Sequence, residues 1–162
     1  MEQGIRISKV LSEMEKRILS SNKKAYYNYE IFEKLETGVV LFGHEVKSLK
    51  QFKVSLANSI VKFFNGEAFI ENMFIAPYEH VSTHVIDYDS KRERKLLMHR
   101  SEIIKIHAKV KGKGFTAIPL EIYVDVRGKV KILIGLAKGK KIYDKREAMK
   151  KRDFTREIAR EY

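Results

Sequence analysis

The basic side chains of this chain gather in two segments, where they are placed to bind phosphate. Thirty-three Lys and Arg stand against 21 Asp and Glu, so the formal net charge is +12 over 162 residues. Residues 91–113 hold nine Lys or Arg and two Glu, and residues 138–162 hold ten Lys or Arg and five Asp or Glu. These two segments account for the whole excess. Such concentrated positive charge favours a polyanionic partner, most often nucleic acid, because cations placed against phosphates release counterions.

Catalytic candidates are few. His84, Asp87 and Asp89 lie close together and define an alternative reading, a metal-dependent nuclease. They fall in a polar stretch with no predicted helix or strand to fix them, and no second cluster matches them. His99 and His107 are two helical turns apart, too far to share an ion. The chain has no Cys and no phosphate-binding or nucleophile motif, so the sequence predicts a binding protein without a cofactor or metal, not an enzyme.

The elements around the first candidate residues follow from turn signals. Residues 26–43 are rich in aromatic and β-branched side chains, and Thr37-Gly38 interrupts them, which predicts two strands joined by a tight turn. Residues 44–52 favour a short helix. Asn65-Gly66 lies between two apolar runs and predicts a hairpin with a two-residue turn. The polar stretch 79–94 predicts a long surface loop.

The second half of the chain has clearer periodicity. Apolar residues at helical spacing predict a helix over about 99–111. Residues 118–126 and 130–136 alternate as strands around a turn at Arg127-Gly128. Together these patterns predict a mainly β fold, a small barrel of the OB type, with about six antiparallel strands and two or three flanking helices. A ferredoxin-like sandwich is the second choice, because it requires a parallel crossover that the pattern lacks.

Three regions are expected. Residues 1–21 form an N-terminal extension with a helical apolar stripe, residues 22–141 form the barrel, and residues 142–162 form a basic tail. No apolar window is long enough to cross a membrane, and the N-terminus lacks the features of a secretory signal. In the tail only Phe154, Ile158 and Tyr162 form a thin stripe. We therefore expect residues after about Arg146 to be disordered in the free protein, since a lone helix with so little to bury is marginal in water.

Four collinear stretches resemble the SsrA-binding protein family, also called small protein B. They read NKKAYYNYEIFEKLETGVVLFGHEVKSLK, NGEAFIENMFIAPYEH, RKLLMHRSEI and KILIGLAKGKKIYDKREAMKKRD, and the most specific motifs within them are GHEVKSL and AKGKKIYDKR. The resemblance extends from about Asn22 to the C-terminus. It implies an OB-type barrel without catalytic activity, which binds the tRNA-like domain of transfer-messenger RNA in the cytoplasm. The resemblance also implies delivery of this RNA to stalled ribosomes for trans-translation.

Site residues follow from the same resemblance. The implied RNA-contact set is Asn22, Lys23, Lys24, Glu36, Glu45, Lys47, Arg94, Lys95, Leu96 and Leu97. The implied ribosome-binding tail, which becomes helical on small-subunit rRNA, contains Gly139, Lys140, Lys141, Tyr143, Asp144, Lys145, Arg146, Lys150, Lys151 and Arg152. We expect a monomer, because no apolar patch is evident.

One position departs from the family pattern. The family often has His where this chain has Tyr143. Both rings can stack on a base, but only imidazole carries charge near neutral pH, so Tyr143 is expected to act by stacking and hydrogen bonding.

The alternative function is that of another OB-type binder of tRNA or rRNA, without a role in rescue.

Overall fold

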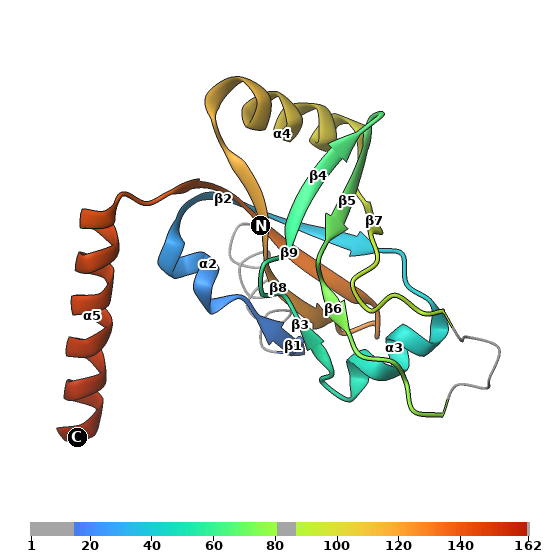
Figure 1. The fold of residues 1–162 in the computed structure, drawn as a ribbon, viewed down its shortest axis with the longest axis horizontal. Coiled ribbons are helices and arrows are strands. Elements are labelled where there is room, and N and C mark those ends of the chain that lie inside the picture. Colours follow the sequence, from blue (N-terminus) through green and yellow to red (C-terminus); the bar gives the residue numbers. More distant parts are fainter. Residues whose placement is uncertain (1–14, 81–86, 162) are drawn as a thin grey trace, which may run out of the picture.

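The centre of the molecule is a single antiparallel sheet of seven strands, in the order β1-β8-β9-β2-β7-β5-β4 (Figure 1). The structure is a computed structural model and describes residues 15–80 and 87–161. The sheet consists of β1 (Arg17–Ser21), β2 (Tyr29–Val39), β4 (Ile60–Phe64), β5 (Glu67–Glu71), β7 (Arg94–Leu97), β8 (Thr116–Val124) and β9 (Val130–Gly139). A second small sheet pairs β3 (Val54–Ser55) with β6 (Phe74–Ile75). The helices are α2 (Lys23–Asn28), α3 (Gly43–Lys50), α4 (Arg100–Lys113) and α5 (Ile142–Glu161).

The mainly antiparallel β fold with flanking helices is confirmed, but the sheet is not a closed barrel. Every strand pairing is antiparallel. The two edge strands, β1 and β4, do not pair with each other in the described part of the chain. β4 nevertheless contacts β8, so the curved sheet brings its edges toward each other around the core. The core beneath it is built from fully buried aliphatic side chains, among them Leu49, Leu56, Ile70, Ile122 and Ile132.

The locally signalled elements form as predicted. β4 and β5 pair with Phe64 opposite Glu67, so Asn65-Gly66 is a two-residue turn. Both turn residues have positive φ, 50° and 73°, which is the conformation that Asn-Gly tolerates in such hairpins. The helix predicted over 99–111 is α4, where the Glu102 carboxylate accepts a hydrogen bond from the backbone N–H of His99 (3.1 Å).

The prediction of two strands within residues 26–43 is wrong. Residues 23–28 form α2, and residues 29–39 form one long strand that passes through Thr37-Gly38 without a turn. Gly38 pairs with Leu97 of β7, and a Cβ at this position would lie 3.2 Å from the Cβ of Leu97. Gly38 therefore permits the close approach of β7 to β2. The glycine that suggested a turn in the sequence is required for this packing instead.

The N-terminal helix expected within residues 1–21 is also corrected in part. Arg17–Ser21 is the edge strand β1, paired with β8, and Leu19 is buried in the core. Residues 1–14, which hold the rest of the expected helix, lie outside the described residues.

At the other terminus, α5 lies at one end of the molecule beside α2, and α3 lies at the opposite end (Figure 1). Among the described residues, no helix has the length and apolarity needed to cross a membrane.

Candidate nucleic-acid interface

Asn22 fixes the position of the first predicted cations. Its Oδ1 accepts a hydrogen bond from the backbone N–H of Ala25 (3.2 Å), which caps α2. Its Nδ2 donates to the carbonyl oxygens of Pro119 (3.0 Å) and Leu56 (3.4 Å). Both polar atoms of the buried Asn22 amide therefore have partners within the protein, and direct contact between this side chain and RNA is not supported. The cap instead places Lys23 and Lys24, both exposed, on the first turn of α2.

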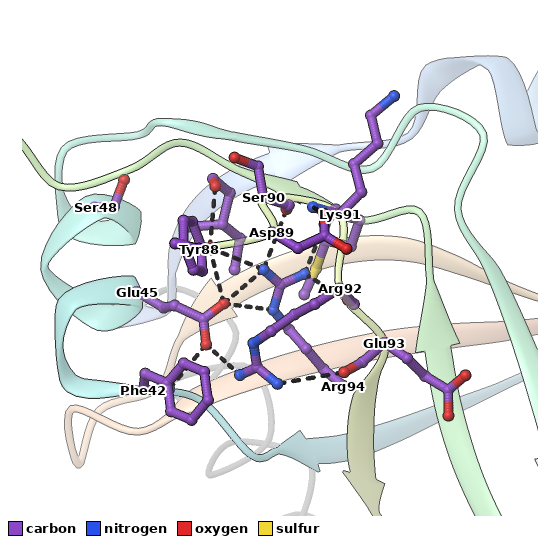
Figure 2. Close-up of polar contacts among 12 residues, drawn as sticks. Phe42, Glu45, Ser48, Tyr88, Asp89, Ser90, Lys91, Arg92, Glu93 and Arg94 are labelled. Atoms are coloured by element: carbon purple, nitrogen blue, oxygen red, sulfur yellow. Dashed lines mark hydrogen bonds and ion pairs between the residues drawn. The ribbon is translucent and has the colours of Figure 1, made fainter. Parts of the chain in front are cut away.

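Glu45 is buried at the centre of a polar cluster that joins α3 to the segment before β7 (Figure 2). Its capping position follows from the sequence, since it is the third residue of α3 and accepts from the backbone N–H of Phe42 (2.9 Å). Its partner is Arg94, which is also completely buried and donates from Nε to Glu45 Oε2 (2.6 Å). Glu45 also forms an ion pair with Arg92.

Arg94 has partners for its whole guanidinium group. Nη1 donates to the carbonyl oxygens of Met73 (2.7 Å) and Arg92 (3.1 Å). Nη2 donates to the hydroxyl of Tyr88 (3.0 Å) and the carbonyl oxygen of Ser90 (3.2 Å). An isolated buried charge is very unfavourable, and this geometry compensates it with an opposite charge and hydrogen bonds.

These contacts bury two of the predicted site residues. Glu45 and Arg94 have no exposed side-chain surface, so they cannot touch an RNA while the fold is intact. Glu45 holds the Phe42 backbone and the Arg92 side chain, and Arg94 holds Glu45. Leu96, a core residue at 1% exposure, is corrected in the same way, whereas its neighbour Leu97 is 55% exposed and can contact a ligand.

The surroundings of Glu45 shift two pKa values. Burial raises the pKa of Glu45, but hydrogen bonds from Arg92, from the Phe42 backbone and from Arg94 outweigh burial, and the pKa lies below its ordinary value of 4.5. Burial and the nearby Glu45 charge raise the pKa of Tyr88 to about 12. The cluster is therefore ionised at Glu45 and neutral at Tyr88 at physiological pH.

The outer edge of this cluster carries residues that the sequence did not single out. The Arg92 guanidinium carbon lies 3.9 Å from the centre of the Phe42 ring, and the Phe42 side chain is 51% exposed. His44 lies between Phe42 and Tyr88, with its ring centre 5.5 Å and 4.8 Å from theirs. Arg92 belongs to the basic segment 91–113, which was the only sequence signal pointing to it.

The remaining predicted contact residues are exposed on neighbouring elements. Lys47 lies on α3, with its Nζ 5.5 Å from the centre of the Tyr78 ring, and Lys95 on β7 forms an ion pair with Glu67. Glu36 is exposed on β2 and accepts a hydrogen bond from the hydroxyl of Tyr123. Burial raises the pKa of Tyr123, and the bond to Glu36 raises it further.

The tail residues leave the sheet from the end of β9, where Gly139 and Lys141 are exposed. The backbone N–H of Lys140 donates to the carbonyl oxygen of Asn28 (2.9 Å), and its Nζ donates to that of Tyr26 (3.2 Å). Further along α5, the Tyr27 hydroxyl contacts the Met149 sulfur (3.2 Å).

Most tail cations face solvent. Lys145 is half-buried; the exposed ones are Arg146, Lys150, Lys151 and Arg152. The side chains of Tyr143 and Asp144 lie outside the described part of the chain, so the expected role of Tyr143 stays a prediction.

The nuclease reading gains no support. His84 lies outside the described residues, and in the rest no group of three His, Asp or Glu is arranged to hold a metal ion. Asp89 instead accepts a hydrogen bond from the backbone N–H of Lys91 (2.9 Å), a local turn contact.

An antiparallel sheet with exposed cations on α2, α3 and β7 and a basic helical tail defines a nucleic-acid-binding protein. Residues 19–162 match the family model described as SmpB protein, and the chain therefore belongs to the SmpB family.

Named relatives agree with this assignment. The chain is similar to the SsrA-binding protein of Persephonella marina, at 51% identity over 146 residues, which cover 90% of this chain and 94% of the relative. It is also similar to the SsrA-binding protein of Coprothermobacter proteolyticus, at 50% identity over 145 residues, covering 90% and 96%. A solved structure described as "tmRNA-SmpB: a journey to the center of the bacterial ribosome" matches with a TM-score of 0.63 at 46% identity, covering 76% of this chain and 85% of that one.

Proposed function

We propose that this protein is an adaptor of ribosome rescue. It binds the tRNA-like domain of transfer-messenger RNA and brings it to stalled ribosomes for trans-translation. The observation that carries this function is the SmpB family match over residues 19–162. Figure 1 places α3 and α5 at opposite ends of the molecule, so the exposed cations of these two helices can face two RNA partners at once, while α2, which carries Lys23 and Lys24, lies beside α5.

The RNA-contact surface for the tRNA-like domain consists of the exposed members of the predicted set. These are Lys23, Lys24, Glu36, Lys47, Lys95 and Leu97. The lysines bind phosphates, and Glu36, which cannot pair with phosphate, accepts hydrogen bonds from base amino groups. Asn22, Glu45, Arg94 and Leu96 support this surface from below.

The tail contacts ribosomal RNA. Its cations are exposed along α5, and the helix buries little against the rest of the chain, which leaves its surface for a partner. Removing residues 142–162 should leave the affinity for the tRNA-like RNA nearly unchanged and abolish peptide tagging in a reconstituted translation system. A protein that only binds tRNA or rRNA would instead lose affinity on this truncation, with a flatter salt dependence.

The protein acts in the cytoplasm as a binding partner and not as an enzyme. The identity of the RNA is tested by sequencing the RNA that co-purifies with the full chain at moderate salt. Enrichment of one tRNA-like RNA is expected, and a broad mixture of tRNA and rRNA would contradict the rescue function. The same RNA should remain intact after incubation with Mg²⁺ or Mn²⁺, and cleavage would support the nuclease alternative.

A further inference from the structure

Phe42 is a large apolar side chain that the fold holds at the surface. It precedes the first turn of α3, and half of the side chain faces solvent. A single exposed apolar residue is common and carries no meaning by itself. Phe42 differs because the Arg92 guanidinium lies against its ring, at 3.9 Å, and because the His44 ring lies beside it, tilted by 33°.

Both members of the Phe42–Arg92 pair are fixed by the same buried carboxylate (Figure 2). Glu45 Oε1 accepts a hydrogen bond from the Phe42 backbone N–H (2.9 Å) and forms an ion pair with Arg92. Glu45 is itself held by the buried Arg94. The backbone of Phe42 and the guanidinium that lies against its ring are therefore held in place before any ligand arrives, which lowers the conformational entropy lost when a ligand stacks on the ring.

We propose that the exposed ring of Phe42 is a stacking platform for an unpaired base of the tRNA-like RNA. The inference rests on the proposed function and adds a contact to it. Aromatic side chains next to Arg are the groups on which single-stranded bases stack, since base, ring and guanidinium are all planar. An apolar protein partner fits this site less well, because the charged Arg92 guanidinium lies against the ring.

The charges near Phe42 favour the tRNA-like RNA, which the contact surface also binds, as the source of the stacked base. Lys91 adjoins Arg92 in the chain, and Lys47 lies on the same helix that Phe42 begins. The backbone N–H of Val40, two residues before Phe42, donates to the carbonyl oxygen of Lys95 (2.9 Å). The same part of the molecule therefore carries exposed lysines that can bind phosphates of an RNA whose base stacks on Phe42. The ribosome-directed α5 lies at the opposite end of the molecule (Figure 1).

The absence of Trp from this chain allows a direct test. Phe42→Trp introduces a single indole at the platform, and Phe64→Trp places one at the β4–β5 turn, on another exposed Phe (68% exposed). Each full-length variant is titrated with a transcript of the tRNA-like domain. We expect the fluorescence at position 42 to be quenched and shifted by the transcript, and the fluorescence at position 64 to stay unchanged. Equal responses at both positions, or a response at position 42 to ribosomes alone, would overturn the inference.

A second variant separates stacking from charge. Phe42→Leu keeps an apolar side chain but removes the ring, and it should weaken binding of the transcript roughly five- to a hundredfold without changing the slope of affinity against salt. Phe42→Trp should retain the wild-type affinity, and the unfolding midpoints of both variants identify any loss of fold. If wild-type protein does not bind the transcript, the proposed function fails. If wild-type binds and Phe42→Leu binds equally well, only the stacking platform fails.

Discussion

Glu45 stabilises the surface around α3 without belonging to it. One carboxylate accepts hydrogen bonds from the backbone of Phe42 and from the side chains of Arg92, Arg94 and Tyr88. The three side-chain partners, Tyr88, Arg92 and Arg94, come from a segment more than forty residues later in the chain, so the cluster joins α3 to the segment before β7. Removing one partner of such a buried pair is expected to cost far more than removing an exposed one.

The substitution Glu45→Gln tests this difference. It leaves the Arg94 guanidinium buried without an opposite charge, and we expect the free energy of unfolding to fall by about 3–5 kcal/mol, measured by urea denaturation. Glu67→Gln, which removes the exposed ion pair with Lys95, is the matched control and should cost less than about 1 kcal/mol. Equal losses from the two substitutions would show that the cluster is no more than a surface contact.

The same carboxylate predicts an acid-dependent stability. The pKa of Glu45 in the folded protein lies below its ordinary value of 4.5, so its charge stabilises the fold at pH values above 4.5. This contribution is lost as the pH falls through the folded-state pKa, because the protonated group no longer compensates Arg94. The stability difference between wild type and Glu45→Gln should therefore narrow below about pH 4.5. A difference that stays constant from neutral pH down to about pH 2 would contradict this assignment.

The sequence could predict which residues belong to the candidate site more easily than what each one does. Motif and charge pointed to Glu45 and Arg94, but their burial depends on packing between residues 49 positions apart. Phe42 carried no signal of its own, since its exposure depends on how Glu45 and Arg92 are placed around it. Short-range pattern therefore located the region, and long-range contacts decided which side chains face solvent.

Among the secondary-structure elements, a prediction was correct where the structure depends on neighbouring residues and wrong where it depends on a strand far away in the sequence. The Asn65-Gly66 turn was predictable because positive φ at both positions is a property of those two residues. The Thr37-Gly38 turn was not, because Gly38 is required by the approach of Leu97 from a strand nearly sixty residues away. The edge strand Arg17–Ser21 was missed for a similar reason, since its apolar residues also fit a helical stripe and only pairing with β8 fixes it as a strand.

The tail helix α5 has few contacts to stabilise it. Phe154 and Ile158 are exposed, and the one side-chain hydrogen bond between the described part of α5 and the sheet domain joins Tyr27 to Met149. A peptide of residues 142–162 should show weak helicity by circular dichroism in buffer at room temperature, and its helicity should rise when rRNA fragments neutralise the Lys and Arg. Strong helicity of the peptide without RNA would contradict the expected disorder of the free tail.

For the whole molecule, the distribution of charge predicts how RNA binding responds to salt. Neutralising a phosphate with a lysine releases counterions, so each such contact adds slightly less than one unit to the slope of log affinity against log salt. Stacking and base-edge contacts add nothing to this slope. The slope therefore counts the cations of the contact surface independently of the total affinity.

Replacing Lys23, Lys24, Lys47 and Lys95 by Gln should lower the slope for the tRNA-like RNA by about three, on the basis of somewhat under one unit per lost phosphate contact. Arg127 and Lys129, exposed at the turn between β8 and β9, provide a control that removes two charges outside the contact surface, and their replacement by Gln should leave the slope unchanged. The measurement is a set of binding isotherms from low to moderate salt with the full-length protein. Equal slopes for the quadruple variant and the wild type would place the RNA elsewhere on the molecule, whereas equal losses per charge removed in the two variants would mean that net charge alone attracts it.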